Sequence, residues 1–213
     1  YTFVIFPIPH KNRIFFTFML LLIPALMNAN NTFNKKYIIV VALEAEVKNS
    51  NIDKFAPIIY TGVGKVNAAI KLYDAILKYK PQLVINYGTA GSVKGKNGLF
   101  HIDTFVQRDM DVRPLGVLRG VTPFSNEKLP KQNGIVLGTG DSFVTDFKKQ
   151  LEGLTISLDL VDMEGYALQK VSTHHNVNFQ SYKYVSDSAN ANAKDDWEKN
   201  VAKGTTLFEE VLT

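Results

Sequence analysis

Three acidic residues are the side chains best suited to do chemistry in this sequence. Each follows an apolar, strand-like run at the point where the next element begins; they are Glu46, Glu164 and Asp187. A fourth run leads into a glycine-rich segment at residues 86–92. Ligands of parallel sheets bind beyond the carboxyl ends of the strands, so we expect these segments to meet at one site. Together they predict an enzyme that breaks a bond to a neutral, hydroxyl-rich ligand, although each acid taken alone better fits a helix cap.

The elements that must position these acids alternate along the chain. Apolar, β-branched runs predict strands at residues 37–43, 57–60, 83–87, 104–107, 135–138 and 182–185. Apolar residues at three- and four-residue spacing predict helices at residues 66–79, 163–174 and 195–212. This alternation predicts an α/β domain with a largely parallel sheet covered on both faces. Residues 108–132 show no clear periodicity and are expected to form a loop over the site.

The first 29 residues differ in composition from the rest. Lys11 and Arg13 precede an apolar run at residues 14–26, and a small residue, Ala29, follows. This pattern predicts an export signal, and a span of the membrane is not expected because a span needs about 20 apolar residues. Two alternatives stay open: a buried helix, or a true start at Met19. The protein is expected to be periplasmic or secreted if the leader is real, and cytoplasmic otherwise; N-terminal sequencing of protein from its native cells would decide.

The remainder, residues 36–213, is predicted to be one catalytic domain. Two of the four net positive charges lie in the leader, so the domain carries about +2, with lysines scattered among acids. No basic stripe is interleaved with aromatic residues, which argues against a nucleic-acid partner. The chain has no cysteine, which excludes thiol nucleophiles, disulfides and cysteine metal sites.

Two further motifs favour structural roles. The segment 61–67 contains two glycines between a strand and a helix but lacks the spacing of a phosphate loop, so a tight turn is expected there. Asp109 and Asp111 are too few to hold a hard cation without other ligands. We therefore expect no metal and no cofactor.

Six short segments, in order, resemble the purine nucleoside phosphorylase/uridine phosphorylase superfamily. They are Ala42–Val47, Thr61–Ala69, Asn86–Gly91, Thr139–Val144, Asp162–Glu164 and Ser186–Asp187. Within the superfamily, the sequence is most similar to 5′-methylthioadenosine/S-adenosylhomocysteine nucleosidases, from about residue 37 to the C-terminus. The resemblance implies a mixed, mostly parallel central sheet flanked by helices, hydrolysis of the N-glycosidic bond of adenine nucleosides, and a homodimer.

The resemblance also implies roles for individual residues. Glu46 would activate water, Asp187 with Ser186 would protonate the adenine at N7, and Glu164 would bind the ribose hydroxyls. The other implied substrate-binding positions are Val63, Thr89, Ala90, Gly91, Val112, Phe143, Val144, Met163 and Trp197. Adenine leaves poorly until it is protonated, so an acid beside the base is chemically required.

Phosphorolysis is the alternative reaction. Phosphorylases of this superfamily carry an arginine just before the glycine-rich segment, whereas this chain has Asn86 there and no arginine between Arg13 and Arg108. A phosphate dianion would lack its usual bidentate partner, so hydrolysis is favoured. A purine-binding protein without turnover is the other alternative, although such a protein would not need Glu46.

The sequence departs from the family pattern at three places. The stretch between Glu46 and Thr61 is short, so a pair of strands is expected to be missing. Tyr166 replaces a small residue and is expected to narrow the pocket. The segment 108–116 only partly follows the family loop in which Val112 and Leu115 would flank the 5′ substituent.

Overall fold

The computed structural model describes residues 37–213, and the predicted leader with its consequences for localisation lies outside this range. The strands of the described part are β1 (Tyr37–Val41), β2 (Ile58–Tyr60), β3 (Leu83–Ser92), β4 (Leu99–His101), β5 (Thr104–Gln107), β6 (Val136–Thr139), β7 (Leu160–Asp162) and β8 (Asn178–Asp187). Its α-helices are α1 (Lys65–Tyr79), α2 (Phe147–Gln150), α3 (Gly165–His174), α4 (Ala193–Asn200) and α5 (Thr205–Leu212). Three short 3-10 helices complete it: η1 (Glu44–Val47), η2 (Ile52–Lys54) and η3 (Arg113–Leu115).

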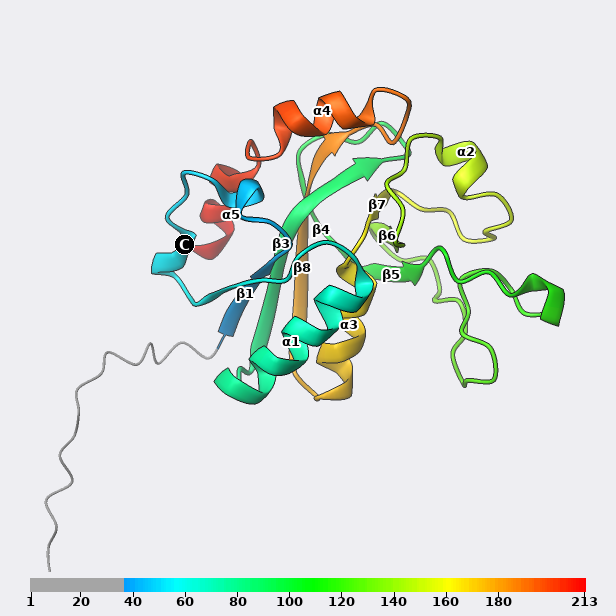
Figure 1. Cartoon of the computed structure of the whole chain (residues 1–213), viewed down its shortest axis with the longest axis horizontal. Coiled ribbons are helices and arrows are strands. Elements are labelled where there is room, and N and C mark those ends of the chain that lie inside the picture. Colours follow the sequence, from blue (N-terminus) through cyan, green and yellow to red (C-terminus); the bar gives the residue numbers. More distant parts are fainter. Residues whose placement is uncertain (1–36) are drawn as a thin grey trace, which may run out of the picture. The chain divides into compact units, whose positions relative to one another are not determined.

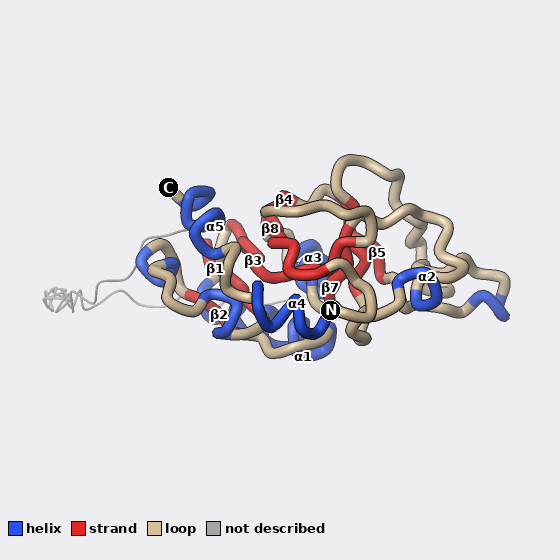
Figure 2. Tube along the Cα trace, turned by 90° about the horizontal axis from the view of Figure 1, so that it is seen from above, coloured by secondary structure: helices blue, strands red, loops and turns tan. Residues whose placement is uncertain are grey.

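The strands between residues 37 and 213 form a single mixed sheet. Its order is β2-β1-β3-β7-β6-β5, and β8 pairs with both β3 and β4. The pairs β3–β7 and β4–β8 are antiparallel, and all the other pairs are parallel. The row of strands from β1 to β5 can be followed in Figure 2. The predicted fold class, an α/β domain with a mostly parallel sheet, is confirmed.

The longest ladder joins β3 to β8. It runs in parallel from Leu83 opposite Asn178 to Gly91 opposite Asp187, with one shift of register between Ala90 and Gly91. The glycine-rich segment at residues 86–92 is therefore the second half of β3. The strand is longer than the predicted range of residues 83–87, because glycines weaken the strand pattern of a sequence without preventing backbone pairing on both sides.

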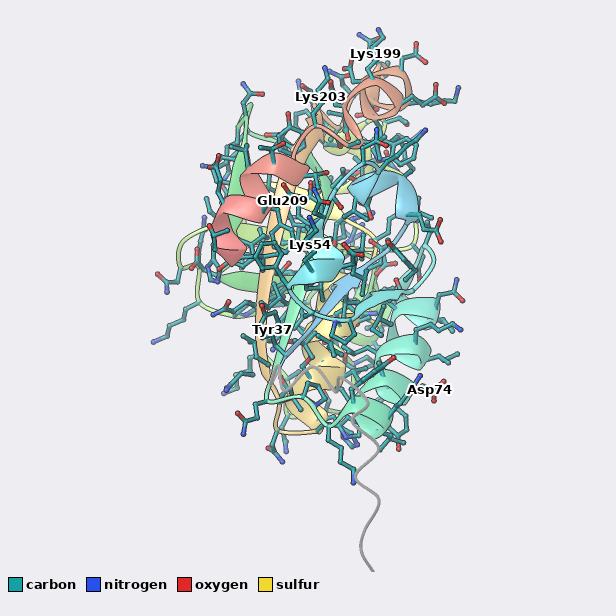
Figure 3. All side chains as sticks on the ribbon, turned by 90° about the vertical axis from the view of Figure 1, so that its left-hand side faces the viewer. Tyr37, Lys54, Asp74, Lys199, Lys203 and Glu209 are labelled. Carbon is teal, nitrogen blue, oxygen red and sulfur yellow. The ribbon has the colours of Figure 1, made fainter. Side chains whose placement is uncertain are left out.

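Two apolar cores cover the two faces of β1 and β3. On one face, Ile38 and Val40 pack with the inward residues of α1 and α3, among them Leu72 and Leu168. On the other face, Ile39 and Val41 pack with η2 and α5. Figures 1 and 3 show α1 and α5 on opposite sides of β1. A strand that is buried on both faces needs a continuous apolar run, which is what residues 37–41 provide.

The predicted helix at residues 195–212 is two helices. The chain turns between Asn200 and Thr205, so that α4 packs at the end of β8 while α5 turns onto the sheet. The reason is Phe208, which is fully buried and stacks on Tyr87 with ring centroids 4.4 Å apart. A single straight helix would not place that ring on the sheet while keeping α4 across the strand ends.

The strand-like run expected before Glu164 is β7, whereas β4 and α2 were not predicted. β4 has three residues and α2 has four, which is too short to show a period. Residues 44–57, where a strand pair was expected to be missing, hold η1 and η2 and lead directly into β2. In the described range, none of the helices has the length and apolar character needed to cross a membrane.

Candidate active site

A cavity of about 470 Å³ lies at the carboxyl ends of β3 and β8. Its volume is in the range of small-molecule sites. All three predicted catalytic acids line it, and so do all the predicted substrate-binding residues except Val112: Val63, Thr89, Ala90, Gly91, Phe143, Val144, Met163, Ser186 and Trp197. Residues that are far apart in sequence are brought together because β3 and β8 are neighbours and η1, β7 and α4 pack around their ends.

Glu46 is held by three hydrogen bonds. It lies on η1 and is 4 % exposed. The Thr89 amide and hydroxyl donate to its Oε1 at 2.7 and 2.9 Å, and the Leu43 amide donates to its Oε2 at 3.1 Å. A carboxylate offers about four acceptor positions. One position therefore remains for a water molecule in the cavity.

The glycines of β3 provide the space that these acids occupy. A Cβ atom on Gly88 would lie 3.1 Å from Glu46 Oε1 and 3.2 Å from Lys183 Nζ. A Cβ atom on Gly91 would lie only 2.7 Å from Asp187 Oδ1. The glycines therefore serve close approach of charged side chains to the strand rather than a turn.

Asp187 ends β8 and is 7 % exposed. The Ser186 hydroxyl donates to its Oδ2 at 2.9 Å, and the Ala189 amide donates to its Oδ1 at 2.9 Å. Burial raises the pKa of Asp187, and these two hydrogen bonds offset only part of that effect. The carboxyl group therefore keeps a proton to a higher pH than an ordinary aspartate does.

Glu164 precedes α3 and accepts a hydrogen bond from the Gly64 amide at 2.9 Å. Burial raises the pKa of Glu164, the charge of Asp162 raises it further, and Lys183 offsets part of the shift. The Gly64 amide of the two-glycine turn at residues 61–67 thus donates a hydrogen bond to the Glu164 carboxylate. This contact gives the turn a role that its sequence did not reveal.

Lys183 is a buried charge that does not line the cavity but lies close to its carboxylates, and the sequence analysis missed it. It is 1 % exposed, and its Nζ lies 2.9 Å from Asp162 Oδ2. Burial alone would lower the pKa of Lys183, but the nearby carboxylates, above all Asp162, raise it. A lysine in a strand is usually taken to face the solvent, so the burial of Lys183 could not be predicted from the sequence.

Arg108 is a second buried cation that was not predicted to lie at the site. It is 1 % exposed and borders the cavity. Its guanidinium group donates to the Gly140 carbonyl at 3.0 Å and to the Ser142 hydroxyl at 3.1 Å, and it also donates to the Ser142 carbonyl. These bonds fix the segment that presents Phe143 and Val144 to the cavity.

Three expectations about segments near the site differ from what the structure shows. Within residues 108–132 only Arg108 lines the cavity, so this segment does not cover the site. Val112 precedes η3 and does not line the cavity, so its contact with a substrate stays a prediction. Tyr166 does not narrow the pocket, because it lies in α3 and its hydroxyl donates to Glu127 at 3.2 Å.

Asp109 is engaged by protein groups. Lys65 Nζ lies 2.6 Å from its Oδ1, and the Asp141 amide donates to its Oδ2 at 2.9 Å. Asp111 pairs instead with Arg113 at 2.7 Å. Within residues 37–213, no group of three or more acidic, histidine or cysteine side chains is arranged to hold a metal ion.

The fold and the sequence can be compared with known proteins. A futalosine hydrolase mutant from Helicobacter pylori superposes with a TM-score of 0.72 at 19% identity, covering 84% of this chain and 98% of that one. An S-adenosylhomocysteine nucleosidase from Streptococcus pyogenes superposes with a TM-score of 0.69 at 20% identity, covering 85% and 96%. At this level of identity the likeness establishes the fold, which is that of the nucleoside phosphorylase superfamily.

Sequence similarity narrows this class. A 5′-methylthioadenosine/S-adenosylhomocysteine nucleosidase from an Exiguobacterium species is 33% identical over 161 residues, covering 64% of this chain and 69% of the relative. One from Staphylococcus aureus is 26% identical over 175 residues, covering 71% and 76%. No model of a protein family matches the chain. On the first similarity, the chain belongs to the family of 5′-methylthioadenosine/S-adenosylhomocysteine nucleosidases.

Proposed function

We propose that the protein hydrolyses the N-glycosidic bond of adenine nucleosides such as 5′-methylthioadenosine and S-adenosylhomocysteine, and releases adenine. It is a nucleosidase by family. The observation that carries the proposal is that Glu46, Glu164 and Asp187 line one cavity. An acid, a base and a hydroxyl-binding carboxylate in one site are the groups that this reaction needs.

Asp187 is the proton donor in this proposal. As the bond from C1′ to the base lengthens, electrons move into the purine, and a proton delivered to N7 makes adenine a better leaving group. The raised pKa of Asp187 supports this role because the donor must be protonated when the substrate binds. Phe143, 42 % exposed at the cavity, is the side chain proposed to stack on the purine.

Glu46 and Glu164 act on the sugar. Glu46 uses its remaining acceptor position to orient a water molecule and take its proton as the water attacks C1′. Glu164 accepts hydrogen bonds from the ribose hydroxyls, and Met163 packs against the ring. The sugar gains positive charge in the transition state, which a preorganised carboxylate stabilises.

Water rather than phosphate is the nucleophile. The donors of Thr89 that could bind an anion already donate to the Glu46 carboxylate, which would itself repel a dianion. Asn86, at the position of the phosphorylase arginine, is buried, and its side-chain amide donates to the Val40 and Tyr87 carbonyls. Arg108 is the nearest arginine at the cavity, but carbonyl and hydroxyl groups of the segment 140–142 occupy its terminal amines.

A substrate panel tests the reaction. The protein is incubated with methylthioadenosine, S-adenosylhomocysteine, adenosine and inosine, with and without phosphate, and the free base and sugar product are measured. We expect adenine release from the two 5′-modified nucleosides at the same rate in phosphate-free buffer, with free sugar as product. A rate that depends strictly on phosphate, with a sugar phosphate as product, would overturn hydrolysis.

We also propose that the protein is a homodimer. The helix α1 has its inward face in the core, yet it carries a second apolar stripe at the spacing of a helical face: Val66, Ile70, Tyr73 and Leu77, which are 68, 56, 44 and 54 % exposed. The stripe continues to Val63 at the cavity edge. An apolar surface of this kind is typical of a protein–protein contact, and a second copy there would border the cavity.

The oligomeric state checks this proposal. Replacing Ile70 by Glu puts a charge in the centre of the stripe, so sedimentation velocity is expected to record a monomer for the variant and a dimer for the wild type. Lys71→Glu, on an exposed neighbouring position of α1, is the matched control and should remain a dimer. A monomeric wild-type protein, or a dimeric Ile70→Glu variant, would contradict this assignment of the interface.

A further inference from the structure

Trp197 connects the covering helix α4 to the proposed base. Its indole Nε1 donates to Thr89 Oγ1 at 3.0 Å, and Thr89 Oγ1 donates to Glu46 Oε1 at 2.9 Å. The three residues come from α4, β3 and η1, and all three line the cavity. The family resemblance named Trp197 and Thr89 only as substrate-binding positions.

The direction of these hydrogen bonds follows from the groups involved. An indole N–H can only donate, and a threonine hydroxyl has a single proton. When Trp197 donates to Thr89 Oγ1, the hydroxyl proton must point elsewhere, and Glu46 Oε1 is the acceptor in reach. Without the indole, the Thr89 hydroxyl can rotate and accept a hydrogen bond from a water molecule. The hydroxyl would then compete with Glu46 for that water.

We infer that Trp197 is a positioning residue for catalysis: its indole N–H orients the Thr89 hydroxyl toward Glu46 and so fixes the base when α4 covers the cavity. This rests on the proposed function, because it requires Glu46 to activate water. Loss of the indole N–H would free the Thr89 hydroxyl and loosen the carboxylate that it holds.

The arrangement of α4 supports this coupling. Trp197 is half-buried, and Asn200 on the same helix donates to the Ser186 carbonyl at 2.8 Å. The helix is therefore attached to the site at two points, one beside the proposed base Glu46 and one beside the proposed acid Asp187. Trp197 bonds to a hydroxyl group whose proton it directs, whereas Asn200 bonds to a main-chain carbonyl, so the two attachments have different consequences when they are removed.

A double-mutant cycle between Trp197 and Thr89 tests the inference. Trp197→Phe keeps an aromatic ring and removes the N–H, and Thr89→Val removes the hydroxyl at nearly constant volume. We expect Trp197→Phe to lower kcat about 2- to 12-fold, the value of one hydrogen bond, with little change in KM. In the Thr89→Val background the same substitution should have no further effect, whereas in Thr89→Ser, which keeps the hydroxyl, the full effect should return.

Asn200→Ala is the matched control, because it removes the hydrogen bond from α4 to the Ser186 carbonyl and leaves the bond from Trp197 to Thr89 in place. Its effect should multiply with that of Thr89→Val. If Trp197→Phe also multiplies with Thr89→Val, or leaves kcat unchanged, the positioning role is wrong. A wild-type protein that releases no adenine from any nucleoside would instead overturn the proposed function, so the two failures are distinguishable.

Discussion

Replacing Asp187 by Asn is expected to lower kcat for adenine release by about 10²–10⁴, the usual contribution of a positioned proton donor. The variant should keep its fold, because the amide can match both existing partners. Its Oδ1 can accept from the Ala189 amide, and its Nδ2 can donate to the Ser186 hydroxyl. What the amide lacks is a proton acidic enough to give to the purine.

Two measurements separate loss of the acid from general damage to the Asp187 site. A ribosyl substrate with a nitrophenolate leaving group, which departs without a proton, should be cleaved by the variant nearly as fast as by the wild type.

The pH profile should also change. In the wild type the rate falls as pH rises and Asp187 loses its proton, at a higher pH than for an ordinary carboxyl group because burial raises its pKa; the Asn variant should lack this alkaline limb. Asp195→Asn, on an exposed position of α4, is the control. An Asp187→Asn enzyme with wild-type kcat for adenine nucleosides would exclude the proposed acid.

Replacing Glu46 by Gln is expected to have the second large effect, a decrease in kcat of about 10²–10⁴ with substrate binding retained. The carbonyl oxygen of Gln can still accept both hydrogen bonds from Thr89. Its amide nitrogen then faces the Leu43 N–H, donor against donor, which should lower the free energy of unfolding by about 1–3 kcal/mol. The variant should therefore fold and bind, but it cannot take a proton from water.

Binding and turnover can be measured separately for this variant. Trp197 is the one tryptophan of the chain and borders the cavity, so its fluorescence reports substrate binding without chemistry. Glu44→Gln is the matched control, since Glu44 is exposed on the same 3-10 helix two residues earlier. A protein that only binds purines would have no turnover to lose, and a Glu46→Gln enzyme at full rate would mean that another group activates the water.

Much of the fold could be predicted because the core elements obey simple periods. The run at residues 37–43 and the spacing of Leu72 and Ile76 in α1 identify a strand buried on both faces and the helix that covers it. The split between α4 and α5 could not be predicted, because it depends on where Phe208 finds Tyr87, a contact between residues far apart in sequence. Local pattern carries no information about such a contact.

The residues of the site also divide into those that the local sequence predicts and those that depend on distant contacts. Glu46, Glu164 and Asp187 could be named from the sequence because each marks the end of a strand within a recognisable segment. Lys183 and Arg108 could not, because buried cations look like surface residues in a sequence. Their burial becomes intelligible only when the partners are known: a carboxylate from β7 for Lys183, and the oxygens of the segment 140–142 for Arg108. Val112 was predicted at the site but does not line the cavity, since a resemblance in a loop does not fix the path of the loop.

The long parallel ladder between β3 and β8 constrains how this site can diversify. Thr89, which holds the proposed base Glu46, and Asp187, the proposed acid, belong to adjacent strands whose register is set by backbone hydrogen bonds. The separation between the groups that act on the two ends of the scissile bond is thus a property of the main chain. Loops around the cavity can consequently be lengthened, shortened or replaced to admit a different 5′ group, while the bond-breaking geometry is inherited unchanged.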